Sequence, residues 1–207
     1  MLKMENRKLH WEHIYQTKQP NEVSWTQDIP KTSLEFIHGF KCAKDAAIID
    51  IGGGDSNLVD NLLAEGFENI TVLDISGKAI ERAKARLGEK ADKVKWVVSD
   101  INDFVPTEKY AVWHDRAAFH FLTSKEEIDN YVAKALNAVS RFLVIGTFSD
   151  TGPKKCSGIE IKQYSEEELE KQLANGFKKV RCVNENHVTP FNTAQNFTFC
   201  SFERNLR

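Results

Sequence analysis

The sequence has no excess of either charge, which argues against a protein built to bind nucleic acid. It contains 28 lysine and arginine residues against 30 aspartate and glutamate residues, for a formal net charge of −2. Proteins that hold DNA or RNA by its phosphates usually carry a strongly basic surface. We therefore expect a partner other than nucleic acid.

Long apolar runs and paired cysteine motifs are also missing. The longest purely apolar runs, such as residues 142–145, are far shorter than the roughly 20 residues that a membrane helix needs. The four cysteines form no C-x-x-C pair and no cysteine–histidine group of the kind that binds zinc. We expect reduced, mostly buried thiols, no metal and no membrane span.

Residues 1–8 lack the apolar stretch of a secretory signal, which predicts a cytoplasmic protein.

What is present describes one folded domain. The chain has 207 residues, of which 41% are hydrophobic and 10% aromatic, and a chain of this length buries enough surface to fold without disulfides or metal. We find no internal repeat, low-complexity tract or linker. The prediction is a single domain over residues 1–207, in which residues 1–40 form a helical lid and residues 46–207 form the core.

Apolar strands alternate with amphipathic helices through most of the chain, which predicts a doubly wound α/β fold with a parallel sheet. The end of the chain differs, because two strands follow one another there without a helix and predict an antiparallel hairpin at one edge. The strands are expected at 46–51, 70–74, 94–98, 110–114, 141–148, 180–184 and 196–202, and the helices at 56–65, at 77–87 and after Ser124 and Ser165.

The clearest local signal is the stretch from Ile48 to Ser56, an apolar strand that runs through Gly52, Gly53 and Gly54 into a helix. Glycines at such a turn let a ligand approach the backbone. The G-x-G-x-x-G pattern of dinucleotide-binding proteins fails here, because Asn57 occupies the position of the third glycine. Asp50 and Asp55 beside the turn favour a ligand with positive charge over a pyrophosphate.

Two more acidic residues end strands at the same predicted edge. Asp74 lies 20 residues after Gly54, where a carboxylate can accept both hydroxyls of a ribose, and Asp100 follows the third strand. Each aspartate could alone be a helix cap, but their combination with Asp50 and the glycines predicts a ligand that contains adenosine.

With these residues, the chain resembles the class I S-adenosylmethionine-dependent methyltransferases. The resemblance rests on Asp50-x-Gly52-x-Gly54, on the LDIS segment at 73–76 and on Ser99-Asp100. It implies a Rossmann-like, mostly parallel seven-stranded sheet with S-adenosylmethionine as cofactor and S-adenosylhomocysteine as product. In that family the glycine turn lies under the methionine part, the acid after the second strand binds the ribose and the acid after the third lies near the adenine. The positions implied here are Asp50, Gly52, Gly53, Gly54, Asp74 with Ile75, and Asp100 with Ile101.

A narrower resemblance links the chain to the methyltransferase subfamily that includes citrate synthase lysine methyltransferase. It is carried by the segments WHDRAAFHFLT at 113–123, TFS at 147–149, GPKKCSG at 152–158, QYS at 163–165, WEHIY at 11–15 and VSW at 23–25. It implies that Trp11, Tyr15 and Trp25 help to enclose the cofactor. Simple packing of the aromatic rings is the alternative, and Trp25, which stands in a polar loop, fits it least.

The predicted substrate side of the site follows the fourth and fifth strands. His114 and Asp115 end the fourth strand, where this fold presents its substrate, so we expect them to be catalytic, with Asp115 orienting the acceptor. Arg116 is expected either to contact substrate or to hold Asp115 by a salt bridge. Cys156 is expected in a substrate-side wall, and His187 either in the pocket or in an exposed loop. His120, between two phenylalanines, is predicted to be a hydrogen-bonded core residue.

These observations predict a methyltransferase, and the narrower resemblance suggests a protein lysine side chain as the acceptor. A small-molecule methyltransferase that acts on a thiol, amine or carboxylate is the alternative. A nicotinamide-dependent oxidoreductase fits the spacing of Asp74 but not Asn57, and a non-catalytic module would not be expected to keep both Asp50 and Asp74. The acceptor and the oligomeric state stay open.

Overall fold

The structure, a computed structural model, describes residues 4–205 and contains the predicted α/β sheet. The central sheet has seven strands in the order β3-β2-β1-β4-β5-β9-β8. The five strands from β3 to β5 are parallel, whereas β9 runs antiparallel to both β5 and β8. The strands are β1 (Ile48–Ile51), β2 (Ile70–Asp74), β3 (Val94–Val98), β4 (Tyr110–Arg116), β5 (Val139–Phe148), β8 (Phe177–Val188) and β9 (Ala194–Arg204). The seven-stranded, mostly parallel sheet and its antiparallel hairpin are therefore confirmed.

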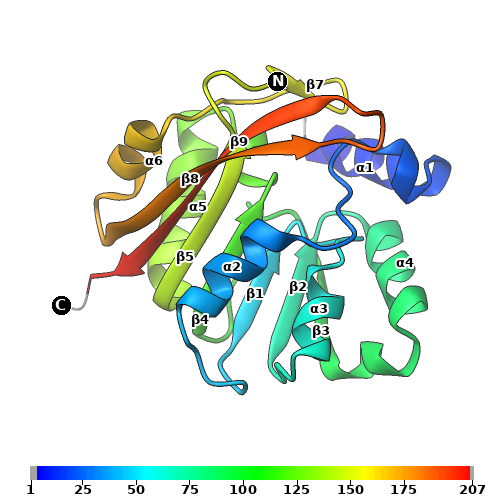
Figure 1. Ribbon diagram of the computed structural model, residues 1–207, viewed down its shortest axis with the longest axis horizontal. Helices are drawn as coiled ribbons and strands as arrows, with labels where there is room; N and C mark the ends of the chain where they lie inside the picture. The colour runs from blue at the N-terminus through cyan, green and yellow to red at the C-terminus, as the bar shows by residue number, and fades with distance from the viewer. Residues whose placement is uncertain (1–3, 206–207) are drawn as a thin grey trace.

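Helices cover both faces of this sheet (Figure 1). The helices α2 (Lys31–Gly39), α3 (Leu58–Ala64) and α4 (Gly77–Leu87) lie on one side, and α5 (Lys125–Ala138) and α6 (Glu166–Leu173) lie on the other. Ile48 packs toward α2 and α3, whereas its neighbour Ile49 packs toward α5, as the alternation of side chains along a strand requires. Short pieces complete the chain: 3-10 helices at Pro20–Glu22, Gly88–Lys93 and Phe119–Phe121, and the two-stranded ribbon of β6 (Lys155–Cys156) and β7 (Ile159–Glu160).

Local sequence signals set the helix ends. Ser124 and Ser165 each accept a hydrogen bond from the backbone N–H three residues on, and Glu127 and Glu168 complete the two capping boxes. Gly88 ends α4 with a positive φ of 57°, a conformation that costs glycine little. These ends lie within two residues of those expected from the sequence.

The N-terminal helix α1 (Met4–Thr17) lies across the carboxyl end of the sheet (Figure 1), whereas α2, also within residues 1–40, packs on a face of the sheet. Residues 1–3 of the predicted lid and residues 206–207 of the predicted domain lie outside the described residues. Glu12 attaches α1 to the start of α4: its carboxylate accepts hydrogen bonds from the Ser76 hydroxyl (2.9 Å) and from the N–H groups of Gly77 (2.9 Å) and Lys78 (3.0 Å). A carboxylate at a helix N-terminus is favoured by the helix dipole as well.

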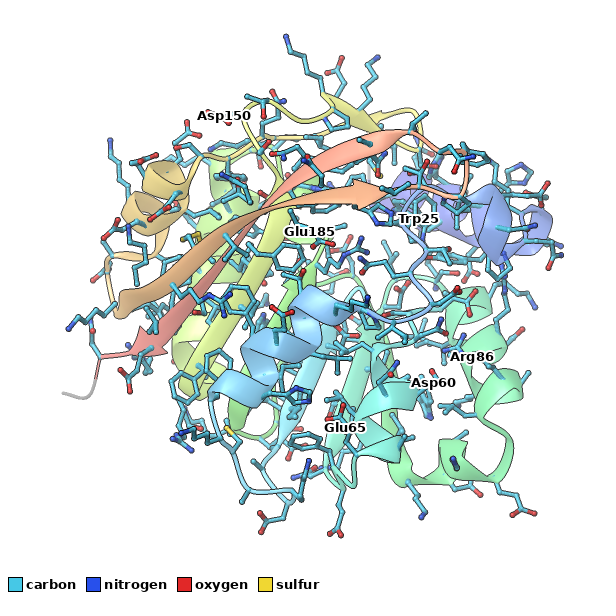
Figure 2. All side chains as sticks on the ribbon, viewed as in Figure 1. Trp25, Asp60, Glu65, Arg86, Asp150 and Glu185 are labelled. Carbon is cyan, nitrogen blue, oxygen red and sulfur yellow. A yellow bond between two sulfur atoms is a disulfide. The ribbon has the colours of Figure 1, made fainter. Side chains whose placement is uncertain are left out.

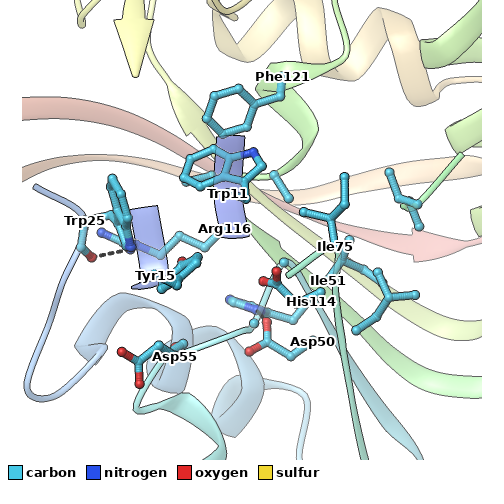
Figure 3. Close-up of a pocket in the computed structure, with 18 of the residues that line it drawn as sticks. Trp11, Tyr15, Trp25, Asp50, Ile51, Asp55, Ile75, His114, Arg116 and Phe121 are labelled. Atoms are coloured by element: carbon cyan, nitrogen blue, oxygen red, sulfur yellow. Dashed lines mark hydrogen bonds and ion pairs between the residues drawn. The ribbon is translucent and has the colours of Figure 1, made fainter. Parts of the chain in front are cut away.

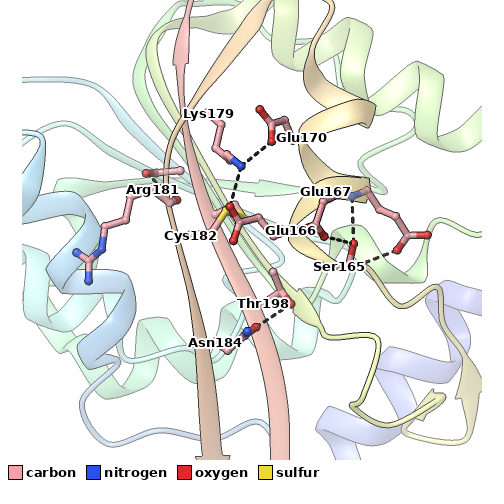
Figure 4. The surroundings of a disulfide bond; sticks show 12 residues. Ser165, Glu166, Glu167, Glu170, Lys179, Arg181, Cys182, Asn184 and Thr198 are labelled. Carbon is pink, nitrogen blue, oxygen red and sulfur yellow. Dashed lines mark hydrogen bonds and ion pairs between the residues drawn. A yellow bond between two sulfur atoms is a disulfide. The ribbon is translucent and has the colours of Figure 1, made fainter.

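The cysteines differ from the expectation of four reduced thiols. Cys182 and Cys200 face each other across β8 and β9 and form a disulfide (Figure 4). Cys42 is half-buried and Cys156 is buried, and both are free. The pairing depends on the register of the hairpin, which the sequence pattern does not reveal.

The described residues contain no helix that is long and apolar enough to cross a membrane. Over the same residues, no group of three or more histidine, cysteine, aspartate or glutamate side chains is placed to hold a metal ion.

The disulfide predicts a thiol count. Protein purified without reductant and then unfolded should expose two of its four thiols to a thiol reagent, and all four after reduction. Reduction should also lower the free energy of unfolding by about 2–3 kcal/mol, because the open chain regains loop entropy. Cys42→Ser should remove one reactive thiol and leave stability unchanged. Four reactive thiols without reductant would contradict the pairing.

The contacts of Glu12 predict that α1 opens more often without its carboxylate. Glu12→Gln should lower the local opening free energy by about 1 kcal/mol, which makes limited trypsin cleavage at Lys18 about fivefold faster. Glu35→Gln, a change at an exposed position of α2, is the matched control. Equal cleavage rates for the two variants would show that Glu12 does not hold the helix.

Candidate active site

A cavity opens at the carboxyl ends of β1, β2 and β4 and reaches the loop that follows β3 (Figure 3). Its floor is formed by the strand ends and the glycine turn, and its roof by α1 and the segment that follows it. Of the predicted site residues, it is lined by Trp11, Tyr15, Trp25, Asp50, Gly52, Gly53, Asp74, Ile75, Asp100, Ile101, His114, Arg116 and Cys156. The predicted edge of the sheet therefore does gather most of these residues around one space.

The glycine turn leaves no room for side chains. Gly52 has a φ of +67°, and a Cβ there would lie 2.7 Å from the Cβ of Ala118. A Cβ on Gly53 would overlap the carboxylate of Asp50, and one on Gly54 would lie 2.5 Å from Oδ2 of Asp74. Gly54 is outside the cavity lining, so its absent side chain makes room for Asp74 rather than for a ligand.

Asp50 and His114 form a buried pair at the base of the cavity. They are register partners on β1 and β4, and His114 Nδ1 lies 2.7 Å from Asp50 Oδ1. His114 Nε2 lies 2.9 Å from the hydroxyl of Ser33, on α2. Both ring nitrogens of His114 are thus engaged within the protein. Ser33 was not identified from the sequence, since no local pattern relates α2 to β4.

Asp115 does not face the cavity. It is fully buried, and its carboxylate accepts hydrogen bonds from the N–H groups of Ala118 (3.1 Å) and Phe119 (3.0 Å) and from the Tyr131 hydroxyl (2.8 Å). Consecutive strand residues point to opposite faces of the sheet, so His114 and Asp115 cannot both point into one cavity. Burial raises the pKa of Asp115 to about 6. Its contacts hold the turn after β4 in place, and the expectation that it orients an acceptor does not fit this geometry.

Arg116 lines the cavity and makes no ion pair with Asp115, contrary to one of the two expectations for it. Its Nη1 donates to the backbone oxygen of Trp25 (2.9 Å), and its guanidinium lies 4.9 Å from the centre of the Phe197 ring. Nε and Nη2 are buried and have no hydrogen-bond partner. Burial lowers the pKa of Arg116 to about 10, so the side chain remains charged near neutral pH.

Asp74 and Asp100 lie at neighbouring strand ends on the other side of the cavity. Asp74 Oδ1 accepts a hydrogen bond from the N–H of Ser76 (2.8 Å), and burial, with further repulsion from Asp50 and Glu12, raises the pKa of Asp74 to about 7. Asp100 Oδ1 accepts from the N–H of Asn102 (2.9 Å). Its Oδ2 is buried without a hydrogen-bond partner and lies 3.6 Å from Nη1 of Arg7.

Asp55 adds little negative charge to the cavity, which corrects the expectation that it favours a cation. It forms ion pairs with Arg86 (2.5 Å) and Arg82 (3.0 Å), both on α4 (Figure 2 labels Arg86). Burial raises the pKa of Asp55 despite these arginines. Asn57, at the missing glycine position, donates a hydrogen bond to the backbone oxygen of Gln27 (3.0 Å) and so attaches the lid segment to the glycine turn.

Aromatic rings form the roof. Trp11 packs edge to face against both Trp25 and Phe121, with ring centres 5.6 Å and 5.2 Å apart, and Tyr15 lies 6.3 Å from Trp25. The rings line the cavity and also pack on each other, so their mutual packing is compatible with the expectation that they cover a ligand. Phe121 was not singled out, although it belongs to the segment that carries the narrower resemblance.

The remaining candidates lie around this roof. Cys156 lines the cavity, and burial raises its pKa to about 12, so it remains a neutral thiol. His187 is buried outside the lining, where its Nε2 lies 2.6 Å from the backbone oxygen of Ser24 and holds the segment that carries Trp25. His120 is a core residue, as predicted: its Nδ1 accepts from the N–H of Phe148 (3.3 Å), and burial lowers its pKa to about 3.

The geometry fits S-adenosylmethionine. A buried acceptor atom without a partner, Asp100 Oδ2, suits an amino group of adenine, and the carboxyl of Asp74 suits paired hydroxyls. Gly52 and Gly53 line the cavity beside Asp50, and aromatic rings cover it, an enclosed arrangement that suits a reacting sulfonium.

Comparison with known proteins agrees with this geometry. Residues 48–142 match the family model of a methyltransferase domain. A mouse (Mus musculus) protein named eEF1A lysine and N-terminal methyltransferase is 26% identical over 140 residues, which cover 66% of this chain. The match covers 20% of that protein, so the chain spans about a fifth of its length.

Solved structures share the fold. The N-methyltransferase NodS from Bradyrhizobium japonicum WM9, in complex with S-adenosyl-L-homocysteine, aligns with a TM-score of 0.67 at 14% identity, over 98% of this chain and 97% of its own. A structure reported for the conversion of a disulfide bond into a thioacetal group in echinomycin biosynthesis aligns with a TM-score of 0.76 at 18% identity, over 96% and 93% of the two chains. Residues 48–142 therefore match a methyltransferase domain, the chain shares the fold of a solved methyltransferase structure, and its cavity fits S-adenosylmethionine.

Proposed function

We propose that the protein transfers the methyl group of S-adenosylmethionine to the ε-amino group of a lysine side chain in a protein substrate. The observation that carries the proposal is the aromatic roof of Trp11, Tyr15, Trp25 and Phe121 over the glycine turn. Methyl transfer needs alignment of nucleophile, methyl group and sulfur in a dry space more than it needs a dedicated base.

In this proposal the floor of the cavity holds the cofactor, which supplies an electrophilic methyl group on its sulfonium. Asp74 accepts the ribose hydroxyls, and Asp100 accepts from the adenine amino group through Oδ2, which has no hydrogen-bond partner within the protein and lies 3.6 Å from Arg7 Nη1. Gly52 and Gly53 lie under the methionine part. Ile75 and Ile101 line the apolar sides of the adenosine site.

The acceptor reaches the methyl group beneath the aromatic roof. A lysine ammonium, with a pKa of about 10.4 in water, must lose its proton before its lone pair can attack. Burial under the rings and the charge of Arg116 both disfavour the ammonium form, which lowers its pKa. Within the protein, His114 uses both ring nitrogens to hold Asp50 and Ser33, so its role here is to position the base of the cavity.

Two observations from relatives support the amine acceptor. The mouse protein, whose name states lysine and N-terminal methylation, is 26% identical over 140 residues. The segments at 11–15, 23–25 and 113–123, which carry the resemblance to the subfamily that includes citrate synthase lysine methyltransferase, contain the roof residues Trp11, Tyr15, Trp25 and Phe121.

A small-molecule acceptor is the second candidate, and the closure of the cavity favours it. Two contacts hold the roof closed. Glu12 attaches α1 to the start of α4, and His187 attaches the loop after α1 to the hairpin of β8 and β9. A free metabolite needs less opening than a protein loop to enter such a space.

The nicotinamide alternative is less suited, because Asn57 occupies the third glycine position and donates its hydrogen bond to Gln27.

Labelling of a cell lysate with tritiated S-adenosylmethionine distinguishes the acceptors. The protein-lysine proposal predicts a discrete labelled protein band whose hydrolysate contains labelled methyl-lysine. Asp74→Asn should abolish the band, whereas Asp45→Asn, at an exposed position outside the site, should leave it unchanged. Label confined to the small-molecule fraction would replace this acceptor with the second candidate.

The pKa of Asp74 predicts a pH dependence of cofactor binding. Because burial raises this pKa to about 7, the free protein holds the carboxyl mostly protonated at lower pH. Ribose hydroxyls donate to the ionised form, so binding should lower the pKa and release a proton. The affinity for S-adenosylhomocysteine should therefore rise with pH through about 7, by up to about tenfold per unit, and then level off.

Calorimetry between about pH 6 and pH 8, in buffers of different ionisation enthalpy, measures both the affinity and the released proton. Asp74→Asn should bind more weakly and lose this pH dependence. A wild-type affinity that does not change with pH, or an equal slope in Asp74→Asn, would contradict the role of Asp74.

A further inference from the structure

Arg116 is a half-buried cation whose hydrogen-bonding capacity is only partly used. One nitrogen, Nη1, donates to the Trp25 backbone oxygen, while Nε and Nη2 are buried and unpartnered. The side chain extends along the wall of the cavity toward Trp25, beneath Trp11 (Figure 3). Buried guanidinium groups normally pair with a carboxylate, since an unpaired buried charge is costly.

No carboxylate in the described part of the chain pairs with this guanidinium within 4.0 Å. The groups whose ionisation would favour the charged form of Arg116 are Glu185, Cys156 and Asp50. Asp50 is engaged by His114. Glu185 Oε1 accepts a hydrogen bond from Gln27 Nε2 at 3.1 Å, whereas its Oε2 is buried without a hydrogen-bond partner and forms no ion pair with Arg116 within 4.0 Å. Cys156 remains protonated, because burial raises its pKa. Asp115, the adjacent residue, points to the other face of the sheet.

The two unpartnered nitrogens lie on one edge of the guanidinium. Nε–H and one N–H of Nη2 point in the same direction, and this fork matches the two oxygens of a carboxylate. We propose that Arg116 binds the carboxylate of a ligand in the cavity through Nε and Nη2. Its third nitrogen stays on the Trp25 backbone oxygen and fixes the orientation of the fork.

Two bound molecules could supply that carboxylate. The first is the cofactor, and this source rests on the proposed function. Ile51 on β1 and Asp115 on β4 are register partners. The next residues along the two strands, Gly52 and Arg116, are therefore neighbours, and Arg116 lies beside the proposed site of the methionine part. The second is the acceptor, because Arg116 also lies against Phe197 on β9, on the far side of the cavity from Asp74. The chemistry is the same in both cases.

Binding measurements on the full chain separate the two sources. The first arm compares S-adenosylhomocysteine with 5′-methylthioadenosine, which keeps the adenosine but has no amino-acid group, for wild type, Arg116→Gln and Arg116→Lys. The second arm titrates propionate, with propionamide as its neutral isostere, into protein saturated with S-adenosylhomocysteine and follows binding by NMR.

If the cofactor supplies the carboxylate, Arg116→Gln weakens S-adenosylhomocysteine binding by about tenfold or more and leaves 5′-methylthioadenosine binding unchanged. Arg116→Lys, which keeps the charge but not the fork, lies between wild type and Arg116→Gln. If the acceptor supplies it, S-adenosylhomocysteine binding is unchanged, and wild type binds propionate but not propionamide, whereas Arg116→Gln binds neither.

The proposal is overturned if Arg116→Gln changes neither arm, or if it weakens 5′-methylthioadenosine as much as S-adenosylhomocysteine, which would mean that Arg116 only shapes the cavity. Retained 5′-methylthioadenosine binding also shows that the variant is folded. If wild type binds no S-adenosylhomocysteine, the proposed function fails. Propionate is then titrated into the free protein. Binding to wild type but not to Arg116→Gln would support the role of Arg116, and no difference between the two proteins would contradict it.

Discussion

The parallel pairing of β1 with β2 on one side and with β4 on the other determines where Asp50, Asp74 and His114 lie in the site. The carboxyl ends of these parallel strands meet at one edge of the sheet, so Asp50, Asp74 and His114 come together although they lie far apart in the chain. Asp50 and His114 are direct register partners with side chains on the same face, which permits their 2.7 Å contact. The glycine turn follows immediately, because a side chain at Gly53 would occupy the space of the Asp50 carboxylate.

The same strand pairing brings several carboxylates into a buried cavity, and neighbouring groups offset their charge. Asp50 contacts His114, Asp55 forms ion pairs with two arginines of α4, and Asp74 accepts a hydrogen bond from the N–H of Ser76. Burial still raises the pKa of Asp74 to about 7, which leaves it ready to ionise when a ligand donates hydrogen bonds. Asp100 and Arg116 keep buried atoms without hydrogen-bond partners. A cavity in which most, but not all, polar atoms are hydrogen-bonded within the protein is preorganised for a polar ligand that completes the remaining bonds.

The sequence was sufficient to predict the sheet, the hairpin and the gathering of the acidic strand ends, because these depend on local periodicity and on where parallel strands end. The face of the sheet toward which a single side chain points was harder to predict. Asp115 was assigned beside His114, although the alternation of a strand directs the two residues apart. The pairing of Cys182 with Cys200 depends on hairpin register, and the anchoring of α1 by Glu12 and of the Trp25 segment by His187 depends on tertiary contacts. No spacing in the chain contains that information.

A crystal structure with S-adenosylhomocysteine tests the central claim most directly, namely that this cavity is the cofactor site. We expect one ligand between the glycine turn and α1, with its ribose hydroxyls on Asp74 and its adenine amino group within hydrogen-bonding distance of Asp100. A ligand elsewhere on the protein, or an adenosine that avoids both aspartates, would contradict it.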